Sequence, residues 1–414
     1  MGLRKTIAKL AFGLPQWSIE MVKPYRLVAR RGVDGIYRGI THSFLLGVLL
    51  AGNVLAESPK PTLHTMKFED FALELPTGLN LEDFYLPADN PINKDKVALG
   101  RSLFFDSLLS SNNSVSCATC HSPQAAFSDS RQVSLGVESR AGDRNAPTII
   151  NRAFSREQFW DGAANSLEEQ AKVPLINPKE MAMPSHELLV KKVGDIRGYK
   201  SWFKRIFARD VNIDDLAKAT AAFERTVVSG NARFDRYKNG NQHALNEAEK
   251  RGLALFEGKA RCSQCHNGPN FTDEKYHNIG VGWDATLVDL GRYKVTRKEQ
   301  DIGAFKTPTL REIAGTAPYM HNGTFATLEE TVTFYNMGGI ANPFLDVEMK
   351  RPNLTLEQML EYYEKKNDPK TPAPETGLVK LELTKQEQAD LVAFLKALSG
   401  QGWQDITSPD SFPE

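Results

Sequence analysis

The chain has 414 residues, of which 41% are hydrophobic and 25% are charged, and its basic and acidic side chains balance at 51 each. This length supports two or three domains with their own hydrophobic cores, and this composition excludes a disordered or fibrous protein. The balanced charge argues against a nucleic-acid-binding protein, because such a surface needs clustered positive charge. Four cysteines are too few for a scaffold held together by disulfides.

The N-terminal segment, residues 1–56, is predicted to be a signal peptide or an N-terminal membrane anchor. It carries eight basic and two acidic side chains, and an apolar run from Ser43 to Ala56 follows its basic part. The uncharged stretch 39–56 has 18 residues, which is marginal for spanning about 30 Å of hydrocarbon. A cleaved signal is therefore favoured over an uncleaved anchor, and export places the mature protein in a periplasm.

All four cysteines lie in two CxxCH pentapeptides, 117–121 and 262–266. In this spacing two thiols add to the two vinyl groups of one haem, and the adjacent imidazole binds the iron. A zinc site made of four cysteines leaves both histidines unexplained, and a pair of disulfide redox motifs needs no histidine. The sequence therefore predicts two covalently bound c-type haems, attached through Cys117, Cys120 and His121 and through Cys262, Cys265 and His266.

The chain also repeats itself around the two motifs. Residues 160–169 match residues 321–330 at an offset of 161, which indicates an internal duplication. Ser166 and Thr327 each precede the sequence Leu-Glu-Glu. This pattern of a capping box predicts that a helix begins at the same place in both repeats.

Helical periodicity dominates the remaining sequence, whereas strand signals are scarce. Apolar residues spaced three and four apart predict helices over 189–193, 213–227, 246–255 and 383–398. Gly and Asn cluster in 231–242, which we interpret as a linker. The proline-rich segment 352–374 is predicted to be a surface excursion.

These patterns predict an all-α fold with few or no strands. Two tandem cytochrome c-like domains are expected, each with one haem. The first domain spans 57–235 and the second spans 236–414.

Several short sequences together resemble the bacterial family of di-haem cytochrome c peroxidases and MauG proteins. They are Asn93–Arg101, Arg144–Thr148, Phe159–Gly162 and Pro318–Gly323, and the resemblance spans about 93–400. It implies an all-α protein of two c-type domains, in which one haem reacts with hydrogen peroxide and the other relays electrons. It also implies one calcium ion between the domains.

The repeat allows the distal positions of the two haems to be compared. Tyr335 lies on one helix face with Leu328 and Val332, and its counterpart 161 residues earlier is Pro174. A proline ring cannot bind iron, so the first haem is expected to be open to peroxide and the second to be capped by the Tyr335 phenolate, which is similar to the MauG type. In the alternative, Tyr335 is a core aromatic and the ligand is Met337, about 200° around the helix.

The resemblance also implies which groups act on peroxide. Glu180 and Gln170 match the family's distal glutamate and glutamine, and Trp160 matches the tryptophan that passes electrons between the haems. Without the resemblance, Glu180 would be interpreted as a solvated loop acid and Trp160 as a core indole. Many family members close the first haem with a distal histidine, but the matching residue here is Val137, which predicts a site that is open without prior reduction.

Calcium ligands are implied at three positions. Asn145 through its side chain, and Thr316 and Pro318 through their carbonyl groups, match the family's ligands, and oxygen donors suit Ca²⁺. His321 occupies the repeat position of Trp160, and the resemblance places it near the second haem but not on the iron. The expected cofactors are therefore two haem c groups and one Ca²⁺.

Three function classes remain open. A MauG-like enzyme uses peroxide to oxidise aromatic side chains of a partner protein, and a conventional cytochrome c peroxidase reduces peroxide with electrons from a small periplasmic cytochrome c or a cupredoxin. A plain electron carrier gains nothing from the open distal position that Pro174 implies. Tyr335 and Val137 favour the MauG-like enzyme. No nucleic-acid partner is expected, and membrane contact is expected only through an uncleaved N-terminal segment.

Overall fold

The computed structural model describes residues 64–350 and 378–414. Ser58–Glu414 forms one compact unit. The predicted signal segment and the predicted proline-rich excursion at 352–374 lie outside the described residues. Within those residues, no helix is both long enough and apolar enough to cross a membrane.

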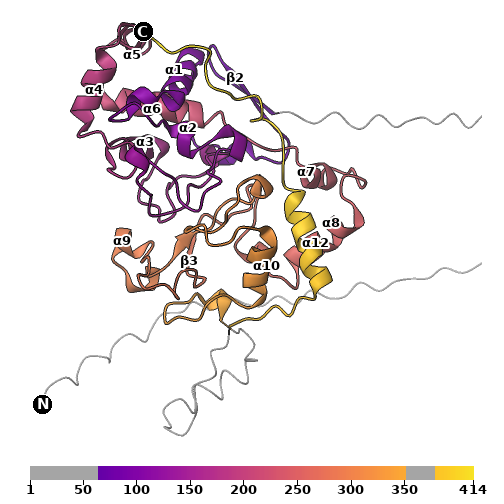
Figure 1. Cartoon of the computed structure of the whole chain (residues 1–414). Helices are drawn as coiled ribbons and strands as arrows, with labels where there is room; N and C mark the ends of the chain where they lie inside the picture. Colours follow the sequence, from indigo (N-terminus) through magenta and orange to yellow (C-terminus); the bar gives the residue numbers. More distant parts are fainter. Residues whose placement is uncertain (1–63, 351–377) are drawn as a thin grey trace, which may run out of the picture. The chain divides into compact units, whose positions relative to one another are not determined.

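Helices make up most of the regular structure (Figure 1). Those of the first repeat are α1 (Lys94–Phe105), α2 (Cys117–Cys120), α3 (Leu167–Ile176), α4 (His186–Gly194), α5 (Arg197–Phe207) and α6 (Ile213–Glu224). They are followed by α7 (Arg233–Lys238), α8 (Glu247–Glu257), α9 (Tyr293–Thr296), α10 (Leu328–Asn336) and α12 (Lys385–Lys396). One hydrophobic core lies among α1, α4, α5 and α6, and another lies among α8, α10 and α12.

Strands contribute only two small antiparallel sheets in the described part of the chain. β1 (His64–Lys67) pairs with β2 (Ala72–Leu75), and β3 (Tyr276–His277) pairs with β4 (Phe305–Lys306). The predicted all-α class with few strands is confirmed.

The four helices predicted from periodicity are present as α4, α6, α8 and α12. Helix α6 ends at Glu224, three residues before the predicted end, because the N–H of Thr226 bonds to the carbonyl of Phe223 at 2.8 Å in a tighter turn. Helix α5 was not predicted. It begins after Ile196, which offers no side-chain cap, so the sequence carries no start signal there.

The internal repeat is visible as two equivalent helix crossings. Helix α1 crosses α6, and a Cβ atom on Gly100 would lie 1.9 Å from the carbonyl oxygen of Ala219. Helix α8 crosses α12, and a Cβ atom on Gly252 would lie 2.0 Å from the carbonyl oxygen of Asp390. Only glycine allows either approach, because a real Cβ atom would collide with backbone.

The two predicted helix starts also correspond. Helix α3 begins after Ser166, whose hydroxyl accepts a bond from the N–H of Glu169 at 3.1 Å. Helix α10 begins after Thr327, whose hydroxyl accepts a bond from the N–H of Glu330 at 3.1 Å. The caps satisfy N–H groups that have no partner within the helix, and both helices therefore start at the predicted residue.

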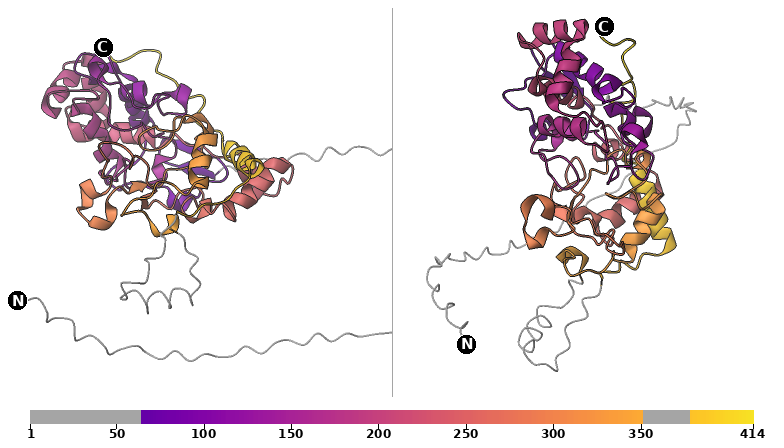
Figure 2. Two further views of the ribbon diagram at one scale, coloured as in Figure 1. Left: turned by 60° about the horizontal axis from the view of Figure 1, so that its bottom comes forward. Right: turned by 60° about the vertical axis from the view of Figure 1, so that its left-hand side comes forward.

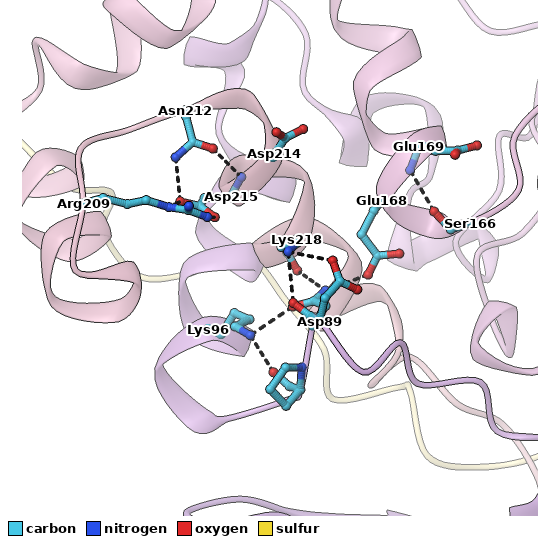
Figure 3. A network of polar contacts seen from close by, with 12 residues as sticks. Asp89, Lys96, Ser166, Glu168, Glu169, Arg209, Asn212, Asp214, Asp215 and Lys218 are labelled. Carbon is cyan, nitrogen blue, oxygen red and sulfur yellow. Dashed lines mark hydrogen bonds and ion pairs between the residues drawn. The ribbon is translucent and has the colours of Figure 1, made fainter.

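A polar network ties α3 and α6 to the segment before α1 (Figure 3). The Nζ of Lys218 on α6 lies 2.8 Å from a carboxylate oxygen of Asp89. The side-chain amide of Asn90 donates to Glu168 of α3 at 2.6 Å, and the buried amine of Lys96 donates to the Asn90 oxygen at 3.0 Å. These contacts fix the position of α3, which carries Gln170 and Pro174.

The predicted linker, 231–242, contains the helix α7. Asp235 of α7 forms a buried bidentate ion pair with Arg311, at 2.8 and 3.0 Å. The predicted boundary between residues 235 and 236 therefore falls inside a helix, and the division into domains stays a prediction.

The C-terminal tail returns to the helices of the first repeat after α12 (Figure 1, Figure 2). The ring of Trp403 packs against Phe127 with centroids 6.1 Å apart, and the N–H of Gly198 on α5 donates to the carbonyl of Glu414 at 2.6 Å. Residues of the predicted second domain thus complete the packing of the first repeat.

Candidate functional site

Both CxxCH histidines are held in the same way by the backbone. The Nδ1 atom of His121 lies 3.3 Å from the carbonyl oxygen of Phe127, and the Nδ1 atom of His266 lies 3.1 Å from the carbonyl oxygen of Phe271. A carbonyl at Nδ1 selects the tautomer whose Nε2 lone pair is available to a metal. Burial lowers the pKa of both imidazoles, which also favours the neutral form that binds iron.

Each CxxCH motif opens into a cavity of its own. The first cavity, of about 490 Å³, is lined by the first motif together with residues of α3 and α6. The second, of about 250 Å³, is lined by the second motif with residues of α10 and α12. A cysteine pair, an imidazole with a free Nε2 and a largely apolar cavity fit a covalently attached haem at both places.

The predicted distal residues of the first repeat meet in the first cavity. Gln170, Pro174 and Glu180 all line it. Glu180 follows α3 in a turn, and the side-chain amide of Asn177 donates to its Oε1 at 2.7 Å. Burial raises the pKa of Glu180, although the bond from Asn177 opposes this shift. Glu180 is therefore a half-buried cavity group, which argues against a solvated loop acid.

Val137 packs away from the first cavity and into the hydrophobic core. Its side chain is 2% exposed, and its N–H donates to the carbonyl oxygen of Glu180 at 2.8 Å. A Cβ atom on Gly136 would lie 2.2 Å from the carbonyl oxygen of Lys179. This close backbone approach holds the loop against the turn that carries Glu180.

The structure separates the two candidate ligands of the second haem. Tyr335 lines the second cavity with Leu328 and Val332, as expected for one helix face, and burial raises the pKa of its phenol. Met337 is 62% exposed and does not line the cavity. The helical phase thus directs the phenol, and not the thioether, toward the predicted haem.

Trp160 borders both cavities. Its indole N–H donates to the carbonyl of Asn145 at 2.9 Å, and its ring lies 6.5 Å from that of His321, measured between centroids. His321 in turn stacks on Phe305 at 3.6 Å. Burial lowers the pKa of His321 to about 4, so its imidazole is neutral at pH 7.

The three predicted calcium ligands lie in the wall of one cavity. Asn145, Thr316 and Pro318 all line the second cavity. The Asn145 amide nitrogen donates to the carbonyl oxygens of Arg131 and Gln132, at 3.1 and 3.3 Å. This orientation leaves the Asn145 side-chain oxygen as the atom that can bind a cation.

Several charged residues of the cavity walls were not predicted from the sequence. Arg152 and Lys306 border both cavities, and burial lowers the pKa of Lys306 to about 8. Arg144 binds Asp289 at 2.7 Å and Asp161 at 2.8 Å. Arg144 begins one of the short sequences that carry the family resemblance, Arg144–Thr148. Its partner Asp289 is 145 residues away and lies in none of those sequences.

Comparison with known proteins agrees with this geometry. The family profile described as di-haem cytochrome c peroxidase matches residues 94–243. "Cytochrome-c peroxidase IdrP1" of Pseudomonas sp. (strain SCT) is 36% identical over 348 residues, which cover 76% of this chain and 83% of that protein. "Methylamine utilization protein MauG" of Methylorubrum extorquens is 38% identical over 319 residues, which cover 76% and 81%.

A solved structure is also similar. The crystal structure of a MauG-like protein associated with microbial copper homeostasis aligns with a TM-score of 0.64 and 32% identity, covering 81% of this chain and 97% of that one. The likeness therefore extends over both cavities and not only over the haem attachment motifs.

Proposed function

Because this chain belongs to the di-haem cytochrome c peroxidase family, and is therefore an oxidoreductase with c-type haems, we propose that it is a MauG-like peroxidase. It takes hydrogen peroxide at the first cavity and uses the oxidising equivalents on aromatic side chains of a partner protein. The observation that carries the proposal is the inward position of Tyr335 beside the exposed Met337.

The residues of the first cavity have separate tasks in this proposal. Cys117, Cys120 and His121 would hold the haem, which would supply the redox chemistry toward peroxide. Pro174 offers no ligand on the side of the cavity where Gln170 and Glu180 lie. The Glu180 carboxylate takes the peroxide proton and returns it to the leaving oxygen, and its raised pKa suits this exchange. Gln170 orients peroxide through its side-chain amide.

The residues of the second cavity determine which kind of substrate receives the oxidising equivalents. An anionic phenolate stabilises ferric over ferrous iron, because the axial ligand sets the haem potential. A haem held by Cys262, Cys265 and His266, with Tyr335 as a further ligand, would therefore accept electrons poorly from ordinary cytochromes. Trp160, which borders both cavities, provides the aromatic contact between them. This combination favours a slow protein substrate over a small reduced cytochrome.

The decisive experiment replaces Tyr335 with Met. We expect the second haem's potential to rise, the weak near-infrared band of a thioether–iron bond to appear, and turnover with reduced cytochrome c to increase. Met337→Leu is the matched control and should change none of these. If the wild-type protein already shows that band, and Met337→Leu removes it, a conventional cytochrome c peroxidase fed by a small cytochrome c or a cupredoxin is the correct function.

The proposal also includes the compartment of the enzyme, its partner and its calcium ion. The signal-like segment 1–56 and the covalent haem motifs support a periplasmic enzyme with a redox protein as partner. One Ca²⁺ at Asn145, Thr316 and Pro318 would join the two repeats, because Asn145 belongs to the first and the carbonyl groups to the second. Removal of calcium with a chelator should then weaken electron exchange between the haems.

A further inference from the structure

Glu224 is a buried carboxyl group in the wall of the first cavity to which the proposed reaction gives no task. It is the last residue of α6 and is 5% exposed. It lines the cavity together with Leu216 and Thr220, which lie two turns and one turn earlier on the same helix. Its Oε2 atom is buried and has no hydrogen-bond partner among the described residues.

The neighbouring guanidinium groups bind other partners. Arg225 donates to both carboxylate oxygens of Glu168, at 2.6 and 3.0 Å, and its Nε donates to the carbonyl of Tyr85 at 3.1 Å. Glu168 is therefore already paired with Arg225 and does not compete with Glu224 for a proton. Figure 3 labels Glu168 in the network that also includes Asp89 and Lys218.

Arg152, on the other side, donates to the side chain of Gln158 at 2.8 Å and to the carbonyl of Glu157 at 3.0 Å. Cys117 also interacts electrostatically with Glu224, and the predicted haem linkage would use its thiol. Burial raises the pKa of Glu224 to about 8, a shift that Arg225 and Arg152 oppose and Glu168 supports. The carboxyl group is therefore mainly protonated at pH 7.

The internal repeat shows that the fold does not need an acid at this position. At the α1–α6 crossing Gly100 approaches Ala219 and Phe223, and at the α8–α12 crossing Gly252 approaches Asp390 and Phe394. The residue after each phenylalanine is Glu224 in the first repeat and Leu395 in the second.

The same correspondence pairs Thr220 with Leu391, and both leucines line the second cavity. The first cavity thus has a hydroxyl and a carboxyl where the second has two leucines. An isolated acid at a position that accepts leucine points to a role in the first cavity and not in helix packing.

We propose that Glu224 is a redox-linked proton site of the first cavity, protonated while the haem iron there is ferrous and ionised when that iron is ferric. One electron and one proton leave together on oxidation, the electron to its acceptor and the proton to solvent, and both return on reduction. The physical cause is that ferric iron adds a positive charge to a cavity of low dielectric constant, which a nearby carboxylate stabilises. The inference rests on haem binding in this cavity but not on the identity of the enzyme's substrate.

The test is the pH dependence of the first haem's midpoint potential, measured by optical redox titration of the holoprotein. In the wild type the potential should fall between pH 7 and 9, by up to about 59 mV for each tenfold drop in proton concentration. Glu224→Gln keeps the size and polarity of the group but cannot ionise, so this slope should disappear and the potential at pH 9 should be higher than in the wild type. Glu224→Leu, which copies the second repeat, should behave in the same way.

Glu180→Gln is the matched control, because Glu180 is another acid that lines this cavity, and it should keep the slope. An infrared difference spectrum between the oxidised and reduced protein should show loss of a carboxylic acid C=O band on oxidation, and Glu224→Gln should lack that band. If Glu224→Gln retains the slope, or if Glu180→Gln abolishes it, Glu224 is not the proton site. Because this readout needs no turnover, a failed Tyr335 experiment would leave it unaffected.

Discussion

Replacement of Glu180 by Gln tests the assignment of the peroxide site most directly. The substitution preserves the size of the side chain, and the amide oxygen of glutamine can still accept the 2.7 Å bond from Asn177. The bond from the N–H of Val137 goes to the backbone carbonyl of residue 180 and is also preserved. The loop and the cavity should therefore keep their shape, and a change in rate would report on proton transfer alone.

The expected loss follows from the task assigned to Glu180. A lost general acid–base group costs roughly a hundred- to ten-thousandfold in rate, which corresponds to about 3 to 5 kcal/mol in the activation barrier. As a base, Glu180 works only when ionised, so the wild-type rate should decrease as the pH falls through its raised pKa. That dependence should be absent from Glu180→Gln.

The assay is the second-order rate constant for the reaction of the diferric protein with hydrogen peroxide, measured by stopped-flow absorption between pH 4 and 8 (about the range in which perturbed carboxyl groups titrate). Glu138→Gln is the matched control, because Glu138 lies on the adjoining loop with a side chain that is 63% exposed and pairs with Arg140. It should react like the wild type. An unchanged rate constant and an unchanged pH profile in Glu180→Gln would refute the assignment and make Glu180 a structural acid of the turn.

Two further predictions concern the haems and the packing between the repeats. The isolated protein should contain two haems that resist extraction with acid acetone. Electron paramagnetic resonance should show a high-spin haem in the first cavity, where Pro174 offers no ligand, and a low-spin haem in the second cavity, where Tyr335 is the ligand. Two low-spin haems would mean that some other residue closes the first site. In denaturant titrations, Arg311→Met should lower the free energy of unfolding by about 3 to 5 kcal/mol, because it leaves Asp235 charged and buried. Adding Asp235→Asn to the same chain should restore part of that loss. A loss below about 1 kcal/mol would mean that this pair contributes no more than an exposed ion pair.

The sequence alone determined the features that depend on neighbours along the chain. Haem attachment requires five consecutive residues, and the two CxxCH motifs therefore predict both cofactors without knowledge of the fold. The starts of α3 and α10 were predicted at the right residue because a cap acts over three residues. The repeat offset of 161 joined these local signals into two equivalent units.

The tertiary structure decided the features that depend on which distant residues meet. Whether Tyr335 or Met337 faces the second cavity depends on the phase of α10 against α12, and Glu180 becomes a cavity group because its turn packs on the loop of Val137. Glu224 could not be recognised from the sequence, because its isolation arises from the pairing of the adjacent Arg225 with a glutamate 57 residues away. Burial and the loss of a partner are properties of the folded chain, and they set the protonation of such groups.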